Sequence, residues 1–135
     1  MTTFNLARAL GATLIGLSLA GSATAARADA KDFEFQLVQK EMKKGDGAVV
    51  AVRLVDRRTG KPVPDAVIFA KRIDMAPDGM PTMTAPLESL PSTEPGVYRF
   101  KTNLAMEGGW QLSLGAKVQG ETDTVGNKLV LKATP

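Results

Sequence analysis

The sequence contains no cysteine and no histidine among its 135 residues. Without cysteine the chain has no disulfide bond and no thiol nucleophile. Without both residue types it cannot build Cys/His zinc sites, and without histidine it has no Ser-His-Asp triad. The folded domain must therefore hold together by its hydrophobic core alone, and we expect a protein that is not an enzyme.

Acidic residues are missing from the first 28 positions, where Arg8 and Arg27 are the only bases. Between these bases Ala9–Ala20 is apolar, and two sites with small residues follow, ending at Ala25 and Ala28. This pattern predicts a secretory signal peptide at residues 1–28, cleaved after Ala25 or Ala28. The apolar run of about a dozen residues is shorter than the ~20 that a membrane-spanning helix needs. We therefore expect an exported, soluble, periplasmic protein without stable membrane insertion, in preference to an anchored one.

Strong charge of either sign is also missing from the predicted mature chain. Removal of the signal peptide takes two of the 17 bases and none of the 14 acids, so the formal charge falls from +3 to +1. The basic character of the whole chain thus belongs largely to the signal peptide, and we expect no nucleic acid among the partners.

After residue 28 no segment has the apolar period of an amphipathic helix. Instead, short segments alternate between apolar and polar residues and are separated by glycine and proline turns. The clearest alternation is Trp110, Leu112, Leu114, Ala116 and Val118. Other predicted strands cover residues 33–42, 50–54, 67–75, 97–101 and 129–131, with residues 87–90 as a further short strand if it forms. Six or seven such strands predict an all-β fold, an antiparallel β-sandwich in a single domain at residues 29–135.

Several side chains have predicted places in this sandwich. Val67 and Phe69 should share one face of their strand with Ile73 and Met75, because all four have odd numbers in an alternating segment. Lys71 is the polar exception on that face. Trp110 is expected in the core. Tyr98, which follows the Pro95-Gly96 turn, is expected to donate a hydrogen bond from its hydroxyl back to the backbone, as in a tyrosine corner.

Methionines gather in one segment, Asp74–Pro86, which holds three of the five that follow the initiator. Its three prolines and its Asp78-Gly79 pair predict a loop and exclude a helix or a central strand. Thioether sulfur is a soft, neutral ligand that suits Cu(I) and suits Mg²⁺ or Ca²⁺ poorly. Methionine is also a flexible filler of irregular gaps, and the segment alone does not separate these two roles. Asp74 and Asp78 could add carboxylate oxygens, although a turn-forming role is favoured for Asp78.

Strand parity brings the other methionines to the same place. If each strand reverses the one before it and residues 87–90 form a strand, alternate loops lie at one end of the sandwich. Met42 would then precede the first loop, Met75 the third, and Met106 would lie in the fifth. All five methionines of the mature chain are therefore predicted at one end.

A series of short motifs follows in order along the chain: Val52-Arg53-Leu54-Val55-Asp56, Thr59-Gly60-Lys61-Pro62-Val63, Met80-Pro81-Thr82-Met83, Gly96-Val97-Tyr98-Arg99-Phe100, and Met106 before Gly109-Trp110. This order resembles the YtkA-like/FixH-like family of exported Ig-like domains. The resemblance implies an Ig-like sandwich outside the cytoplasm, linked to copper or heavy-metal handling. It also implies metal-efflux or copper-oxidase assembly proteins as partners. By the resemblance, Met80, Met83 and Met106 are the metal ligands. Met75, in the same methionine-rich segment, is kept as a reserve ligand although it matches no motif of the family.

Two functions remain open from the sequence. One is a periplasmic accessory protein that binds Cu(I) or Ag(I) through Met80, Met83 and Met106. The other is an interaction module without metal, which docks an efflux adaptor or an oxidase-assembly partner through the same methionine-rich surface. Because no histidine follows the Met-Pro-x-Met motif, we expect Cu(I) rather than Cu(II) as the metal.

Overall fold

A computed structural model describes residues 30–135 of the chain. The predicted signal peptide and its cleavage sites lie outside these described residues. Within residues 30–135 there are ten β-strands, two 3-10 helices and no α-helix. In chain order they are η2 (Ala30–Asp32), β1 (Phe33–Leu37), β2 (Glu41–Lys43), β3 (Gly45–Asp56), β4 (Lys61–Pro62), β5 (Val67–Met75), η3 (Ala76–Asp78), β6 (Met80–Ala85), β7 (Leu87–Leu90), β8 (Val97–Leu104), β9 (Gly108–Lys117) and β10 (Thr124–Thr134). In this part of the chain no helix is long and apolar enough to cross a membrane.

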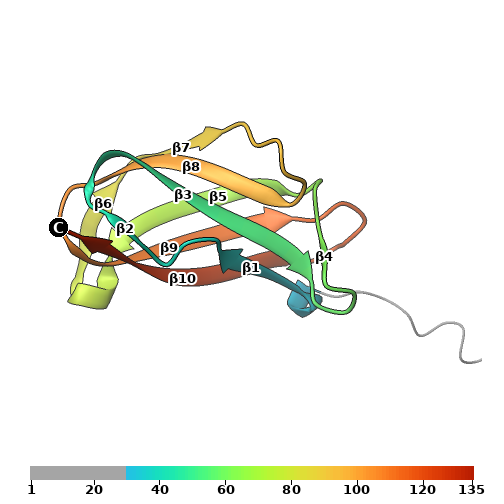
Figure 1. Ribbon diagram of the computed structural model, residues 1–135. Helices are drawn as coiled ribbons and strands as arrows, with labels where there is room; N and C mark the ends of the chain where they lie inside the picture. The colour runs from blue at the N-terminus through green and yellow to red at the C-terminus, as the bar shows by residue number, and fades with distance from the viewer. Residues whose placement is uncertain (1–29) are drawn as a thin grey trace, which may run out of the picture.

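The strands form two five-stranded sheets that pack face to face (Figure 1). Sheet A has the order β1-β3-β8-β7. The short strand β4 pairs with the end of β3, beyond the part of β3 that pairs with β8. Sheet B has the order β2-β10-β9-β5-β6. Every pairing is antiparallel except that of β10 with β2. This architecture confirms the predicted all-β sandwich, and the short strands β4 and β6 are additions that the sequence patterns did not predict.

The core lies between the two sheets and is built from alternate residues of the long strands. Trp110, Leu112 and Leu114 of β9 are at most 4% exposed, as the alternation in the sequence predicted. Val50, Val52 and Leu54 of β3 face them from sheet A and are fully buried. Full burial of each such aliphatic side chain contributes about 1.5–3 kcal/mol.

The predicted strand at residues 33–42 is wrong as a single element. β1 pairs with β3 in sheet A, whereas β2 pairs with β10 in sheet B, so the chain changes sheets between them. The Val38 N–H still donates to Ala51 in sheet A (3.0 Å), while the Lys40 carbonyl already accepts from Lys132 in sheet B (2.8 Å). This crossing needs a bend at residues 38–40, which the alternation in the sequence does not reveal.

The predicted facing of Val67 and Phe69 is also wrong. The pairing of β5 with β9 shifts between Ile68 and Ala70, where β5 has a bulge. An extra residue in one strand reverses the facing of the side chains before it. Val67 and Phe69 are accordingly exposed by 64% and 59%, whereas Ile73, beyond the bulge, is fully buried.

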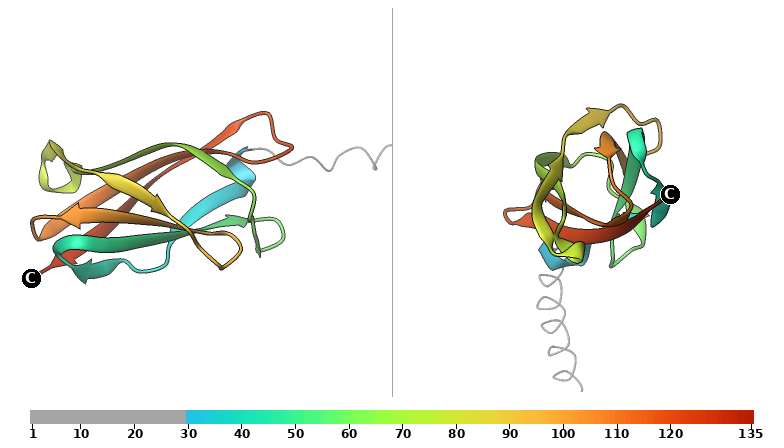
Figure 2. Two further views of the ribbon diagram at one scale, coloured as in Figure 1. Left: turned by 90° about the horizontal axis from the view of Figure 1, so that it is seen from above. Right: turned by 90° about the vertical axis from the view of Figure 1, so that its left-hand side faces the viewer.

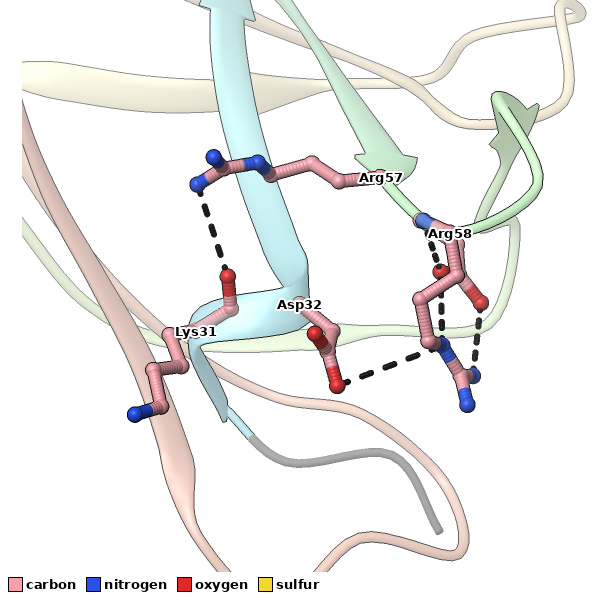
Figure 3. A network of polar contacts seen from close by, with 5 residues as sticks. Lys31, Asp32, Arg57 and Arg58 are labelled. Carbon is pink, nitrogen blue, oxygen red and sulfur yellow. Dashed lines mark hydrogen bonds and ion pairs between the residues drawn. The ribbon is translucent and has the colours of Figure 1, made fainter. Parts of the chain in front are cut away.

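A polar network joins η2 to the turn between β3 and β4 (Figure 3). The Arg57 N–H donates to the Asp32 carbonyl (2.7 Å), and the Arg57 guanidinium donates to the Lys31 carbonyl (3.5 Å). The Arg58 guanidinium pairs with the Asp56 carboxylate (2.9 Å) and lies 4.0 Å from that of Asp32. Hydrogen bonds from the Arg58 side chain hold the pKa of Asp56 below its ordinary value. These contacts fix the start of the domain against sheet A.

Tyr98 forms the predicted bond to the backbone. Its hydroxyl donates to the Val63 carbonyl (2.7 Å) and accepts from the Ala66 N–H (3.1 Å). Burial raises the pKa of the Tyr98 hydroxyl, so it stays protonated and able to donate at neutral pH. The side chain thereby ties β8 to the loop between β4 and β5.

Replacing Tyr98 by phenylalanine should lower the free energy of unfolding by about 1–3 kcal/mol, because two hydrogen bonds are lost. The ring should stay in place, since its edge-to-face contact with Phe35, at a centroid distance of 6.4 Å, does not need the hydroxyl. Urea unfolding of both proteins measures the difference. An unchanged midpoint would show that these two bonds do not hold the loop.

Candidate functional site

All five methionines of the described chain lie towards one end of the sandwich, which we call the methionine end. The end is at the left of Figure 1, near the C-terminus, and at the left of the first view in Figure 2. It contains the turn between β2 and β3, the β5–β6 loop with η3, and the β8–β9 loop. The pairing of Gly45 with Leu104 brings the turn between β2 and β3 to the end of β8, and the hydrogen bond from the Gly109 N–H to Asp78 joins the β8–β9 loop to the β5–β6 loop. Residues 87–90 do form a strand, β7, which is the condition on which the parity argument depended.

The methionines differ in how accessible they are. Met80 and Met106 are exposed by 36% and 39%, whereas Met75 is fully buried in the core. Met42 and Met83 are half-buried and pack against that core. Met80 and Met106 are therefore the side chains that could reach an ion without a change in the fold, and Met75 serves as a core residue in this structure.

The β5–β6 segment is partly a strand and not a simple loop. β6 pairs with the end of β5 through Met75↔Met80, Asp74↔Thr84 and Ile73↔Ala85, so Pro81, Thr82 and Met83 form a bulge of three extra residues. β6 tolerates Pro81 because it is an edge strand. The sequence excluded a central strand at this segment, and the structure agrees. The bulge places Met83 next to the strand end that carries Met75.

Arg72 and Asp74 hold this bulge against β5. Asp74 is 4% exposed, and its carboxylate accepts from the Arg72 guanidinium and from the Ala76 N–H, both at 2.9 Å. The Arg72 guanidinium also donates to the Pro81 carbonyl (2.7 Å). Asp74 is thus engaged in shaping the loop. The sequence analysis did not include Arg72 in the site. Its position two residues before Asp74, on the same face of the strand, was a signal for this ion pair.

Asp78 joins the two loops that carry the exposed methionines. Its carboxylate accepts from the Gly109 N–H at 3.2 Å, at the start of β9. Gly79 follows with a φ of 77° and donates to the Ala76 carbonyl (2.9 Å), which closes the predicted Asp-Gly turn. Met80 comes directly after this turn, and Met106 comes three residues before Gly109. The contact therefore fixes the β5–β6 loop beside the β8–β9 loop.

The glycine pair at the start of β9 allows this close approach. A Cβ on Gly108 would overlap the Asp78 carboxylate and would lie 3.0 Å from the Met75 methyl carbon. Gly108 also has a φ of 133°, which side chains rarely tolerate. A Cβ on Gly109 would lie 2.9 Å from Pro77. The sequence indicated only a turn at these glycines, because the segment that packs on them is 30 residues away.

Trp110 positions Met106. The indole N–H donates to the Met106 carbonyl at 2.9 Å, while the ring is 1% exposed in the core. A buried indole needs an acceptor for its one donor, and here the loop supplies it. The core position of Trp110 was predicted from the sequence, and its role as an anchor for the methionine loop was not.

The methionine end offers soft, neutral donors and little else. Among residues 30–135 there is no group of three His, Cys, Asp or Glu side chains that could hold a metal ion. Asp74 and Asp78 are both engaged with backbone N–H groups. The donor set therefore fits a monovalent soft ion such as Cu(I) or Ag(I) better than Zn²⁺, Mg²⁺ or Ca²⁺.

Comparison with known proteins gave a family and two structural likenesses. A protein-family model described as YtkA-like matches residues 27–115, more than half of the chain. Among solved structures, the chain is similar to the Lin-41 filamin domain, with 19% sequence identity and a TM-score of 0.49, over 81% of this chain and 98% of that one. It is also similar to the C-terminal domain of ZirS, with 11% identity and a TM-score of 0.41, over 83% of this chain and 74% of that one. No curated protein matches the sequence.

Proposed function

The chain belongs to the YtkA-like family, and we propose that it is an exported, periplasmic protein that binds Cu(I) or Ag(I) through Met80, Met83 and Met106. In this proposal the protein is a metal-binding accessory and not an enzyme. One observation carries the proposal: the Asp78–Gly109 hydrogen bond holds the loop with the exposed Met80 beside the loop with the exposed Met106.

The chemistry of the donors supports a monovalent soft ion. Thioether sulfur carries no charge, so a set of methionines can accept and release Cu(I) without placing several negative charges together. Thioethers also carry no proton near neutrality, so the affinity for Cu(I) should be nearly constant from about pH 5 to about pH 8. Zinc prefers imidazole or thiolate, and neither is present in this chain, so no comparable zinc binding is expected.

The combined change Met80→Leu and Met83→Leu should abolish binding of Cu(I) by the mature protein. Leucine keeps the apolar volume nearly constant, so the urea midpoint should hardly change. Competition with a Cu(I) chelator measures the affinity of both proteins.

Met42→Leu is the matched control, because Met42 is half-buried at the same end and is not a proposed ligand. This variant should bind Cu(I) as the parent does. Unchanged affinity in the Met80/Met83 variant would refute the ligand assignment, and equal loss in both variants would indicate a general effect of methionine content.

The exposure of Met80 and Met106 also favours a second function, in which the methionine end docks a partner protein. Flexible, polarisable methionine side chains suit such an apolar contact. We expect an efflux adaptor or a copper-oxidase assembly protein in this role. Met80→Glu should then prevent docking, whereas the Met80→Leu/Met83→Leu variant should dock normally while it fails to bind Cu(I). The two variants therefore separate a docking role from a metal-binding role.

A further inference from the structure

The methionines of the described chain differ in their access to an oxidant. Met80 and Met106 are exposed by 36% and 39%, Met42 and Met83 are half-buried, and Met75 is fully buried. Because the chain has no cysteine, thioethers are its only sulfur groups, and an accessible thioether is readily oxidised to a sulfoxide. The fold therefore sorts side chains of equal intrinsic reactivity into two that meet solvent and one that does not.

A hydroperoxide is the chemical class of oxidant that fits these two side chains. A lone pair on the methionine sulfur attacks one oxygen of hydrogen peroxide, so the S–O bond forms as the O–O bond breaks. The sulfur gives up two electrons and becomes a sulfoxide. The second oxygen leaves as hydroxide and takes up the proton of the transferred oxygen, which yields one molecule of water. The attack needs only an open approach to the sulfur, which exposure supplies.

The contacts that hold the two methionine loops do not use sulfur. Asp78 accepts from the Gly109 N–H, and the Met106 carbonyl accepts from the Trp110 indole. Oxidation of the Met80 and Met106 side chains leaves both bonds in place. The new sulfoxide oxygen would lie at the surface, where water satisfies it, so we expect little effect on the free energy of unfolding.

Oxidation of Met75 would have the opposite effect on stability. Its methyl carbon packs so closely on the start of β9 that a Cβ on Gly108 would lie 3.0 Å from it. A sulfoxide there would bury a polar oxygen in the core and add volume where none is free. The burial of Met75 thus protects the sulfur whose oxidation would damage the fold.

Oxidation and metal binding compete for the same sulfur atoms. A sulfoxide is a poor ligand for Cu(I) or Ag(I), because a sulfur lone pair now holds the oxygen and that oxygen is a hard donor. Conversely, an ion bound to a thioether draws electron density from the sulfur and covers its open side. Metal-loaded protein should therefore resist peroxide, and oxidised protein should no longer bind the ion.

We propose that Met80 and Met106 form a peroxide-sensitive switch, in which a hydroperoxide converts both to sulfoxides, ends binding of the soft metal ion and leaves the fold intact. The effect on the metal rests on the proposed function. The selective oxidation of the pair rests on the exposure of the two side chains alone.

The first experiment treats metal-free mature protein with hydrogen peroxide and follows each methionine by peptide mass mapping. Met80 and Met106 should gain oxygen about tenfold faster than Met75 or more, because access to the sulfur sets the rate. The matched control is the same protein unfolded in urea, where all methionines should react at similar rates. Protein oxidised only at Met80 and Met106 should keep the urea midpoint of the parent.

The second experiment uses Ag(I) as the probe, because copper itself reacts with peroxide. Saturating Ag(I) should slow oxidation of Met80 and Met106 by about tenfold or more, whereas the same concentration of Zn²⁺ should not, since zinc binds thioethers poorly. Oxidation of Met42, which is not a proposed ligand, should be unaffected by Ag(I). Protein already oxidised at Met80 and Met106 should bind Ag(I) about tenfold more weakly or worse.

Three results would overturn the switch. The first is oxidation of Met75 as fast as that of Met80 and Met106 in the folded protein. The second is a lower urea midpoint after oxidation of Met80 and Met106 alone. The third is Ag(I) binding that survives this oxidation, which would leave the proposed function standing with other ligands. Failure of the unoxidised protein to bind Ag(I) would instead overturn the proposed function, and the switch with it.

Discussion

Replacing Trp110 by alanine should lower the free energy of unfolding by about 3–5 kcal/mol, because a large aromatic side chain leaves a well-packed core. The ring is 1% exposed, and Trp110 lies near the start of β9, the strand between β5 and β10. The substitution also removes the donor that holds the Met106 carbonyl. We therefore expect a lower urea midpoint together with greater mobility of the β8–β9 loop, measured by amide hydrogen exchange.

Met80→Ala is the comparison for this loss. Met80 is 36% exposed on an edge strand, so its truncation should cost less than about 1 kcal/mol, as most surface changes do. Urea unfolding of the two variants under the same conditions gives both values. If Met80→Ala were as damaging as Trp110→Ala, Met80 would be a core residue, and its assignment as a ligand would be untenable.

Gly108→Ala should lower the free energy of unfolding by about 2–4 kcal/mol, because it combines a strained backbone with overpacking. The new methyl group would overlap the Asp78 carboxylate and press on the Met75 side chain. The structure can relieve this overlap by moving η3 away from β9, which would break the Asp78–Gly109 hydrogen bond. The variant should therefore also bind Cu(I) more weakly, if the two loops form the proposed site.

Gly126→Ala is the control for the Gly108 prediction. A Cβ on Gly126, in β10, would meet its nearest neighbour at 3.7 Å, which is an ordinary van der Waals contact. Its substitution should change the free energy of unfolding by less than about 1 kcal/mol. Equal losses in the two variants, measured by urea unfolding, would mean that the loss at Gly108 reflects strand glycines in general and not the packing of η3.

Much of the fold follows from local patterns in the sequence. The alternation from Trp110 to Val118 predicted β9, its facing and its burial, because a strand that lines the core has period two. The Pro95-Gly96 turn and the residues after it predicted β8 and the bond of Tyr98 to the backbone. These features depend on neighbours within a few residues, which the sequence displays directly.

The features that the sequence did not reveal depend on segments far apart in the chain. The crossing of residues 38–40 from one sheet to the other is set by pairing of β2 with β10, some ninety residues later. The bulge at Ile68 and Ala70 is set by β9, and it reversed the expected facing of Val67 and Phe69. Side-chain periodicity within one segment cannot show the change of sheet or the bulge. Both depend on the residues with which a strand pairs.

The same distinction holds for the candidate site. Parity placed the methionines at one end correctly, since it needs only the order of strands. The sequence could not show that Met75 is buried while Met80 is exposed. This difference depends on the β6 bulge and on its contact with Arg72.

The position of β10 has a consequence for the order in which this domain folds. β10 is the last strand in the chain, yet it is an inner strand of sheet B, between β2 and β9. A chain emerging from its N-terminus can pair β1 with β3, but β2 has no partner until β10 follows. Proteins dominated by such distant pairings fold over about milliseconds to seconds, more slowly than helical bundles. The core therefore stays open until the final strand arrives, and a truncation before Thr124 should leave a polypeptide unable to close it.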